Sequence, residues 1–416
     1  MNDPVTVPGP PRLHLFEGFG VELEYMVVDV ESLSVMPVVD RVLEAVAGRI
    51  VAEVELGPLA WSNELVLHVV ELKTNGPAPG LAGLDAAFQA DVREINQILG
   101  TMGGMLLPTA MHPWMDPEAE TRLWPHEHSP VYSAYDRVFG CRGHGWSNLQ
   151  STHLNLSFGT DEEFGRLHAA MRLLLPLIPA LAASSPLVDG KPTGLLDNRM
   201  EVYRGNSARV PSVVGQVIPE PVFTQREYED RIMGRMYADI APMDPEGILR
   251  DEFLNSRGAM PRFGRGSIEI RVVDVQEAPR ADLCIAALVV GGLQLLVREA
   301  FTSAPAQRSM DQASLVSTFL DCVRRGDEAV VGDRRYLEAL GWRERRASAA
   351  EIWWHLLEEA DRAGSLRDGG LYEVARTLLR RGPLAREILR ALDFAGGRPP
   401  QSGTPVPRPW LEEVYR

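Results

Sequence analysis

The stretch GVELEYMVVD, residues Gly20–Asp29, decides the fold class of this chain. Its acidic residues Glu22 and Glu24 alternate with apolar ones. Successive side chains of a β-strand point to opposite faces, so this alternation predicts a strand with one apolar face. The strand therefore places two carboxylates together on one face of a sheet.

Three further stretches repeat the alternation and pair polar side chains on one face. The pairs are Glu71/Lys73, His153/Asn155 within Ser151–Phe158, and Glu269/Arg271 within Ser267–Val273. If the four strands lie side by side, one sheet face carries carboxylates, an imidazole and a guanidinium. Carboxylate oxygens suit Mg²⁺, and arginine makes bidentate contacts to phosphate, so the set can hold a divalent cation and a triphosphate.

Each pair also has an ordinary explanation. Glu22 and Glu24 fit an exposed strand face, His153 and Asn155 a polar face, and Glu269 and Arg271 a simple salt bridge. Adjacent carboxylates repel each other, however, which favours a cation between them. The conjunction of the pairs indicates a site more strongly than any pair alone.

Glu64 is a further candidate, but it precedes Glu71 by an odd number of residues. An odd separation places two side chains on opposite faces of an unbroken strand. Both carboxylates serve one site only if a bulge or turn lies between them.

Helical periodicity fills much of the remaining chain. Apolar residues recur every three or four positions over Leu81–Leu99, which predicts an amphipathic helix. Thr160 and Glu163 form a T-x-x-E capping box before an apolar helix that Pro176 and Pro179 should interrupt. The segment Lys191–Arg226 lacks periodicity and is interpreted as a long loop, and the pattern from Ala281 to about Leu392 is mostly helical. Strands interspersed with and followed by helices predict an α+β fold.

We expect four parts of the chain. They are a flexible arm at 1–15, a catalytic α+β domain at 16–303, a helical part packed on the same body at 304–395, and a Pro/Gly-rich tail at 396–416. The apolar faces of the C-terminal helices, including Trp353, serve either the core or a homodimer interface, and core is favoured.

Composition limits the partners. The 416 residues include 42 basic and 57 acidic side chains, a formal net charge of -15 that repels nucleic acid. Three scattered cysteines do not form a disulfide framework and fit a reducing cytoplasm. Apolar runs such as Ile285–Val297 fall short of the roughly 20 residues that span a bilayer. We expect a cytoplasmic protein without nucleic-acid or membrane partners.

Common catalytic motifs are absent from the sequence. It lacks the phosphate loop G-x-x-x-x-G-K-[ST], the G-x-S-x-G elbow, H-E-x-x-H, and a G-x-G-x-x-G that opens a helix. His112, His126 and His128 have irregular spacing in a loop-like stretch, which does not favour a zinc site.

The order of the strand segments resembles glutamate-cysteine ligase family 2, the bacterial carboxylate-amine ligases. The resemblance rests on FGVELEY at 19–25, SNELVLHVVELKTNGP at 62–77, STHLNLSFG at 151–159 and GSIEIRVVDVQ at 266–276. A Thr-x-x-His-Pro-like piece at 109–113 and LLPLIPALAASSPLVDGKPTGLLDNR at 174–199 add to it. It implies a fold like the catalytic domain of glutamine synthetase, in which a curved antiparallel sheet forms a semi-barrel with helices outside.

The resemblance also assigns roles to residues of this chain. The metal ligands would be Glu22, Glu24, Glu64, Glu71 and Glu269. The catalytic residues would be Glu269, Arg271 and His153. Contacts to ATP or substrate would come from Arg199, Arg257, Asn155 and Lys73.

The implied reaction uses ATP and Mg²⁺ or Mn²⁺ to convert a carboxylate, with glutamate expected, into an acyl phosphate that an amine attacks. Two departures, Lys73-Thr74-Asn75 and the loop at 198–219, leave the acid and the amine open. A phosphotransferase on the same scaffold and a non-catalytic Mg-ATP-binding regulator are the alternatives.

Overall fold

The computed structural model describes residues 12–365, 371–396 and 401–416. Its main sheet has eight strands, all paired antiparallel, in the order β2-β3-β4-β1-β6-β10-β9, with β5 also paired to β1. The strands are β1 (Phe19–Asp29), β2 (Glu53–Leu56), β3 (Leu59–Asn63), β4 (Val69–Thr74), β5 (Gly104–Leu107), β6 (Ser151–Ser157), β9 (Ala259–Arg262) and β10 (Ser267–Asp274). The sheet is open, and the predicted α+β class with an antiparallel sheet is confirmed.

The four strands with polar pairs are neighbours in this sheet, in the order β4-β1-β6-β10. Glu24 lies opposite Glu71, and Glu22 lies opposite Lys73 on one side and His153 on the other. On the next strand pair, Asn155 lies opposite Glu269. Antiparallel pairing in this register brings all four polar pairs to one face of the sheet.

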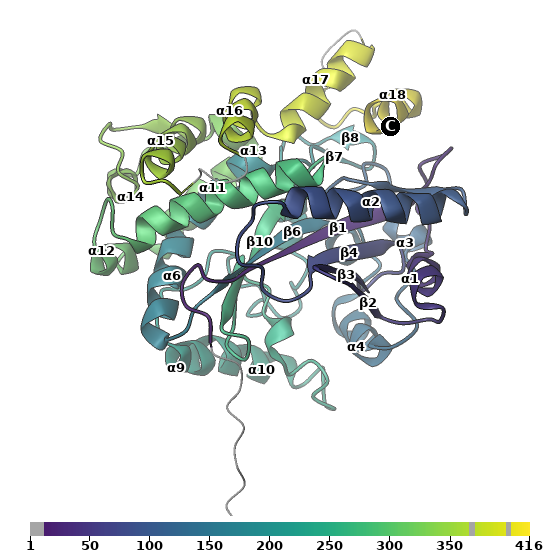
Figure 1. Ribbon diagram of the computed structural model, residues 1–416, viewed down its shortest axis with the longest axis horizontal. Helices are drawn as coiled ribbons and strands as arrows, with labels where there is room; N and C mark the ends of the chain where they lie inside the picture. Colours follow the sequence, from purple (N-terminus) through teal and green to yellow (C-terminus); the bar gives the residue numbers. More distant parts are fainter. Residues whose placement is uncertain (1–11, 366–370, 397–400) are drawn as a thin grey trace, which may run out of the picture.

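Helices cover the apolar face and the edges of the sheet, and Figure 1 shows α2 and α11 lying across it. From the first half of the chain come α1 (Val39–Ala47), α2 (Leu84–Gly100), α3 (Pro117–Glu120), α4 (Ser129–Phe139), α5 (His144–Ser147) and α6 (Asp161–Leu174). The middle contributes α7 (Pro179–Ala182), α8 (Asn198–Tyr203), α9 (Gln225–Tyr228), the π-helical turn Glu229–Met233, α10 (Gly234–Ile240) and α11 (Pro279–Val297). Short 3₁₀ turns occur at Leu175–Leu177, Glu252–Leu254 and Gly326–Glu328, and β7 (Leu187–Val188) pairs with β8 (Lys191–Pro192).

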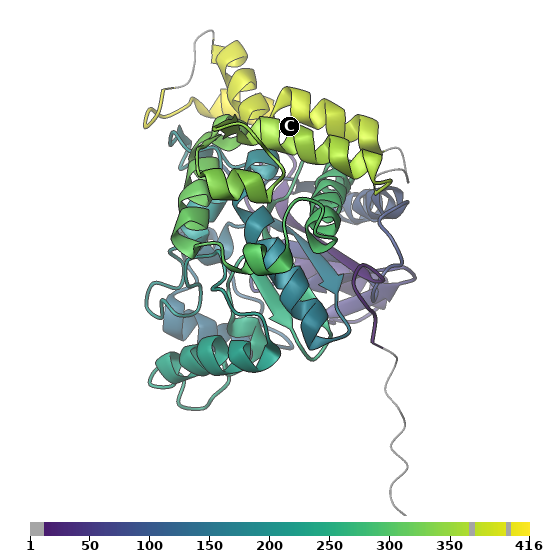
Figure 2. The same ribbon diagram turned by 90° about the vertical axis from the view of Figure 1, so that its left-hand side faces the viewer.

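The C-terminal helices gather along one side of the molecule, drawn in green to yellow in Figure 2, where α15 and α16 pack against α11. They are α12 (Ala304–Arg308), α13 (Gln312–Arg325), α14 (Arg334–Ala339), α15 (Ala349–Arg362), α16 (Leu371–Arg381), α17 (Leu384–Gly396) and α18 (Arg408–Tyr415), with β11 (Val330–Val331) paired to β12 (Ala347–Ser348). The Trp353 side chain is fully buried, and its indole N–H donates to the carbonyl of Leu177 at 2.8 Å. Trp353 therefore belongs to the core, as favoured from the sequence.

α11 is longer than its apolar run indicated, because the helix begins at Pro279. This helix of 19 residues is long and apolar enough to cross a membrane by length and composition alone. The apolar run expected from the sequence, Ile285–Val297, was too short for that. Its most apolar window is 78% buried among the surrounding helices and the sheet. The helix therefore packs as a core helix of this fold.

Several local expectations are refined by the structure. α2 begins at Leu84 and not at Leu81, because the preceding Gly83 adopts a left-handed conformation with φ 82°. The Thr160 hydroxyl caps α6 as predicted, but the Glu163 carboxylate accepts from the N–H of Gly159, one residue earlier than a capping box requires. Pro176 and Pro179 interrupt the helix as expected.

The two ends of the chain were expected to be an arm and a tail. Residues 1–11 of the arm lie outside the described residues. The end of the Pro/Gly-rich tail forms α18, whose Leu411 is buried in a cluster with Leu187, Ile388 and Leu392. The segment interpreted as a loop, Lys191–Arg226, contains the short helix α8.

Candidate active site

His153 occupies the centre of the polar sheet face. Its Nδ1 donates to Glu22 at 3.0 Å, and its Nε2 lies 2.9 Å from the Ser151 hydroxyl, which itself donates to Glu24 at 2.8 Å. Because the hydroxyl has one proton and gives it to the carboxylate, Nε2 of the imidazole must be a donor as well. Both ring nitrogens of His153 are therefore protonated and hydrogen-bonded.

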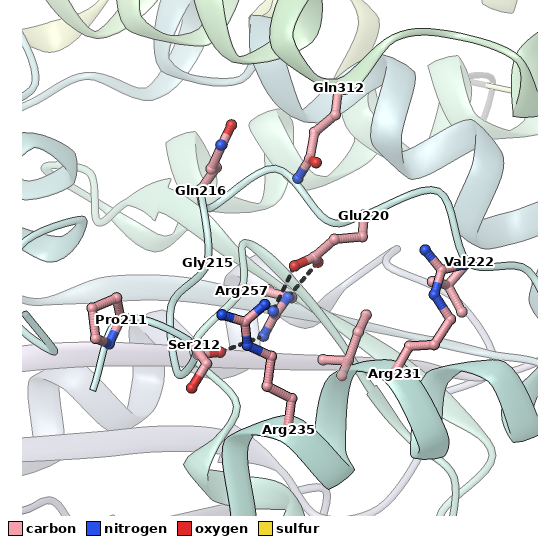
Figure 3. Close-up of a pocket in the computed structure, with 11 residues that line it drawn as sticks. Pro211, Ser212, Gly215, Gln216, Glu220, Val222, Arg231, Arg235, Arg257 and Gln312 are labelled. Atoms are coloured by element: carbon pink, nitrogen blue, oxygen red, sulfur yellow. Dashed lines mark hydrogen bonds and ion pairs between the residues drawn. The ribbon is translucent and has the colours of Figure 1, made fainter. Parts of the chain in front are cut away.

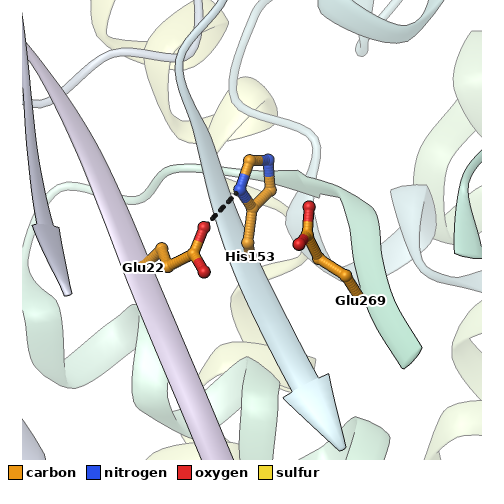
Figure 4. A group of neighbouring side chains, drawn as sticks. All are labelled: Glu22, His153 and Glu269. Carbon is orange, nitrogen blue, oxygen red and sulfur yellow. Dashed lines mark hydrogen bonds and ion pairs between the residues drawn. The ribbon is translucent and has the colours of Figure 1, made fainter. Parts of the chain in front are cut away.

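Two groups of potential metal ligands share this histidine. Glu22, His153 and Glu269 form one group, shown in Figure 4, and Glu24, Glu71 and His153 form the other. In each group the nearest ligand atoms lie within 4.8 Å of one another. All four predicted strand pairs thus contribute at least one residue to two adjoining candidate sites for a cation.

Glu269 is held between two guanidinium groups. Its two oxygens accept from Arg271 Nε at 2.6 Å and from Arg262 Nε at 2.8 Å, and its side chain is 1% exposed. Burial alone would raise the pKa of Glu269, but Arg271 and Arg262 outweigh it and lower this pKa to about 2. Glu269 is therefore ionised throughout the physiological range.

The pKa values of the neighbouring side chains are shifted in different directions. Burial would lower the pKa of His153, but the hydrogen bond with Glu22 and the charges of Glu24 and Glu269 raise it above the ordinary value. Burial raises the pKa of Glu24. Burial and the charge of Glu269 would raise the pKa of Glu22, but its hydrogen bond and charge interaction with His153 outweigh them, so this pKa is lowered. The cluster is buried and has an excess of carboxylates.

Glu64 and Glu71 are brought to the same part of the site by a turn. β3 ends at Asn63 and β4 begins at Val69, so the break that their odd separation requires is present. Burial, then the charges of Glu71 and Glu24, raise the pKa of Glu64 well above its ordinary range. The two carboxylates are therefore close enough to repel.

Lys73 lies at the edge of this acidic group. Its ammonium contacts Glu53 at 2.7 Å, Glu71 at 3.1 Å and the Ser62 hydroxyl at 2.9 Å. Burial would lower the pKa of Lys73, but these carboxylates raise it. Lys73 is thus a fixed counter-charge to Glu71 in this structure.

Arg199 and Asn155 also reach the cluster. The Arg199 guanidinium is buried, donates to the carbonyl of Arg271 at 2.8 Å and contacts Asp274 at 3.3 Å. Its Nε has no hydrogen-bond partner among the residues that the structure describes. Asn155 Nδ2 donates to Glu22 at 3.0 Å. Arg199 thus has a free donor, whereas Asn155 orients Glu22.

Arg257 lies apart from the other predicted site residues. Its guanidinium forms a bidentate pair with Glu220, at 2.6 and 2.7 Å, and lines a pocket that contains no residue of the acidic cluster (Figure 3). The expected contact of Arg257 with the nucleotide or the substrate in that cluster therefore has no support in its geometry.

Sequence patterns missed two contributors to the cluster, Arg262 and Glu53, and assigned no role to a third, Ser151. Arg262 lies on β9, which forms a hairpin with β10 around Gly264–Gly266. Gly264 and Gly266 lie between two short strand-like segments, and glycines in that position are a sequence signal for a β-hairpin. The alternation placed Ser151 on the same strand face as His153, whereas Glu53 carried no comparable signal, because its contact with Lys73 depends on strand register.

The sequence matches the family model described as glutamate-cysteine ligase family 2 over residues 18–399. The chain belongs to glutamate-cysteine ligase family 2. A protein of uncharacterized function from Archaeoglobus fulgidus is 36% identical over 65% of this chain and 72% of its own length. A Rubrobacter xylanophilus protein called "Putative glutamate--cysteine ligase 2-3" is 26% identical over 65% of this chain and 67% of its own. The resemblance seen in the strand segments is confirmed.

A solved structure extends the comparison to the fold. The bifunctional glutathione synthetase from Pasteurella multocida aligns over 96% of this chain with a TM-score of 0.56 and 14% identity. The chain spans about half, 51%, of that protein. The likeness shows a shared fold, and the family places the chain among the ATP-dependent carboxylate-amine ligases.

Proposed function

We propose that this protein activates a carboxylate, with glutamate as the expected acid, by phosphorylation from ATP and joins it to an amine. The observation that carries the proposal is the pair of ligand groups around His153, with Arg262 and Arg271 beside Glu269. A family resemblance supplies the reaction class, and the sheet face supplies the charges that the reaction needs.

The donor set fits Mg²⁺ or Mn²⁺. Four carboxylates and one imidazole converge on the face, and hard oxygen ligands suit these ions. Glu22, Glu24, Glu71 and Glu269 would hold the metal, with Glu64 beside them, and His153 would join them on losing one of its ring protons. Bound there, the metal would neutralise the phosphate oxygens of ATP.

The cations of the chain itself can orient the phosphoryl group. Arg271 uses Nε for Glu269, and its other nitrogens form no hydrogen bond to any part of the chain that the structure describes. Those nitrogens can donate hydrogen bonds to phosphate or carboxylate oxygens. Glu269 fixes the Arg271 guanidinium, so orientation is established before the substrate arrives.

The reaction has two balanced steps. A carboxylate oxygen of the acid attacks the γ-phosphorus and ADP leaves, which gives an acyl phosphate. The amine nitrogen then attacks the carbonyl carbon, phosphate leaves, and the amine gives up a proton. Both nitrogens of His153 already donate hydrogen bonds, so a carboxylate of the cluster is better placed to accept that proton.

The test is incubation with Mg-ATP, glutamate and either cysteine or a mixed pool of amino acids and amines, followed by phosphate release and mass spectrometry. ADP together with a new amide-sized mass is the expected result and names the acceptor. Formation of ADP with a phosphorylated product and no amide would indicate a phosphotransferase instead. Binding of Mg-ATP without any turnover would indicate a regulator.

A further inference from the structure

A cavity of about 520 Å³ lies away from the acidic cluster, where the loop at 211–222, the π-helical turn and the start of α13 meet. Its polar lining, drawn in Figure 3, consists of Ser212, Gln216, Glu220, Arg231, Arg235, Arg257 and Gln312. Pockets of this volume accommodate small molecules.

The cavity carries surplus positive charge. Glu220 is the only carboxylate among the described residues that line it, and Arg257 neutralises that carboxylate through two hydrogen bonds. Arg231 has no carboxylate within ion-pair distance in the part of the chain that the structure describes. Within the described residues, the one ion pair of Arg235 is with Asp239, at 3.6 Å on the exposed helix surface. Two guanidinium groups thus remain for a ligand, in a chain whose net charge is -15.

The loop at 211–222, which forms one wall of the cavity, contains two residues with positive φ. Gly215 has φ 57°, and a Cβ added there would lie 3.1 Å from the Arg257 guanidinium. Val217, a β-branched residue, has φ 66°, which is a costly conformation for such a side chain. Arg231 lies within the π-helical turn Glu229–Met233, a rare form that is frequent at functional sites.

The loop is also fastened to the segment before β9. Arg257 Nη1 donates to the carbonyl of Ser212 at 3.1 Å, and the Gly258 N–H donates to the carbonyl of Val217 at 2.8 Å. The position of the loop is therefore fixed by buried hydrogen bonds, which makes the cavity a preformed one.

We propose that this cavity binds a small anion with at least two carboxylate or phosphate groups, held by Arg231 and Arg235. The two arginines are four residues apart across the junction of the π-helical turn and α10, so their guanidinium groups can reach one ligand together. Planar guanidinium groups bind both carboxylate and phosphate through paired hydrogen bonds. The site is separate from the acidic cluster, and its existence does not depend on the ligase reaction.

The test is calorimetric titration of the full-length protein in magnesium-free buffer with inorganic pyrophosphate and, separately, with glutarate. Saturable binding of at least one probe with one site per chain is expected. The double variant Arg231→Gln/Arg235→Gln should weaken it by at least about tenfold, because charge-assisted hydrogen bonds are lost. Tighter binding of pyrophosphate would identify a phosphate ligand, and tighter binding of glutarate a dicarboxylate.

Two control variants separate this site from general charge effects and from the acidic cluster. Arg226→Gln removes one positive charge from the neighbouring helix α9, where Arg226 is 93% exposed, and should leave the affinity unchanged. Glu269→Gln should also leave it unchanged, even if ligase turnover is lost. Absence of saturable binding, full affinity in the double variant, or an equal loss in Arg226→Gln would overturn the proposal.

Discussion

The Glu269→Gln substitution tests the electrostatics of the site most directly. The change keeps the size of the side chain but removes the charge that Arg262 and Arg271 contact at 2.8 and 2.6 Å. The pKa of Glu269, about 2 against an ordinary 4.5, already combines burial, repulsion and these two ion pairs. At about 1.4 kcal/mol per pH unit, the ionised carboxylate contributes about 3 kcal/mol to the free energy of unfolding.

The sign of the pH dependence follows from the lowered pKa. The contribution is fully present above pH 4.5, and it is lost as the pH falls toward 2, because the folded protein then takes up the proton. Glu269→Gln should therefore be less stable than the parent by about 3 kcal/mol at pH 7, and by less as the pH falls. Its ATP turnover should be abolished while the fold remains intact, because the Arg271 guanidinium loses its anchor.

The assay is urea unfolding followed by circular dichroism at several pH values, with phosphate release measured at pH 7. Glu358→Gln is the matched control, because Glu358 is 60% exposed and its contact with Arg362 spans 3.5 Å. That variant should change stability by less than about 1 kcal/mol. Three results would refute the proposed role of the Glu269 charge. They are a loss of unfolding free energy in Glu269→Gln no larger than in the control, a loss that does not depend on pH, and retained ATP turnover.

Three further predictions concern other parts of the structure. Asp282→Asn should match or exceed the parent in stability at pH 9, because burial raises the pKa of Asp282 from 3.8 to about 8, so the parent loses stability as the pH rises through this range and the loss is complete at pH 9. Asp282→Ala should lose about 2 kcal/mol in urea unfolding, since two buried donors lose their acceptor, and equal losses in both variants would contradict this. Added Mg²⁺ or Mn²⁺ should raise the Tm of the parent, with about 2.7 kcal/mol gained at a hundredfold excess over Kd, but should raise that of His153→Gln less. Arg408→Gln should increase hydrogen exchange in α18, because the guanidinium lies 3.8 Å from the Trp114 ring centroid, and unchanged exchange would count against this contact.

The sequence predicted the main strands because their alternation is a local property. Gly20–Asp29 corresponds to β1, and Ser151–Phe158 and Ser267–Val273 correspond to β6 and β10 within a residue or two at their ends. The order of these segments was enough to indicate the family, which the family model confirms. The faces of the strands followed as well, since side-chain direction has a period of two.

The partners of each side chain depended on tertiary structure. Arg257 was grouped with the phosphate-binding residues, yet Glu220, far from it in the sequence, pairs with it at another pocket. Arg262 was overlooked, although its strand completes the contacts of Glu269. Such pairings are set by register and by loop paths, which a single sequence does not encode at any fixed spacing.

The sequence by itself therefore determined the α+β class, the family and the set of polar residues on one sheet face. Only the tertiary structure decided that His153 lies between two carboxylate groups, that Lys73 is held by Glu53 and Glu71, and that a basic cavity forms around Arg231 and Arg235. Local periodicity fixes where each side chain points along its own strand or helix. Distances between strands, and hence charges and pKa values, arise only when segments remote in sequence are packed together.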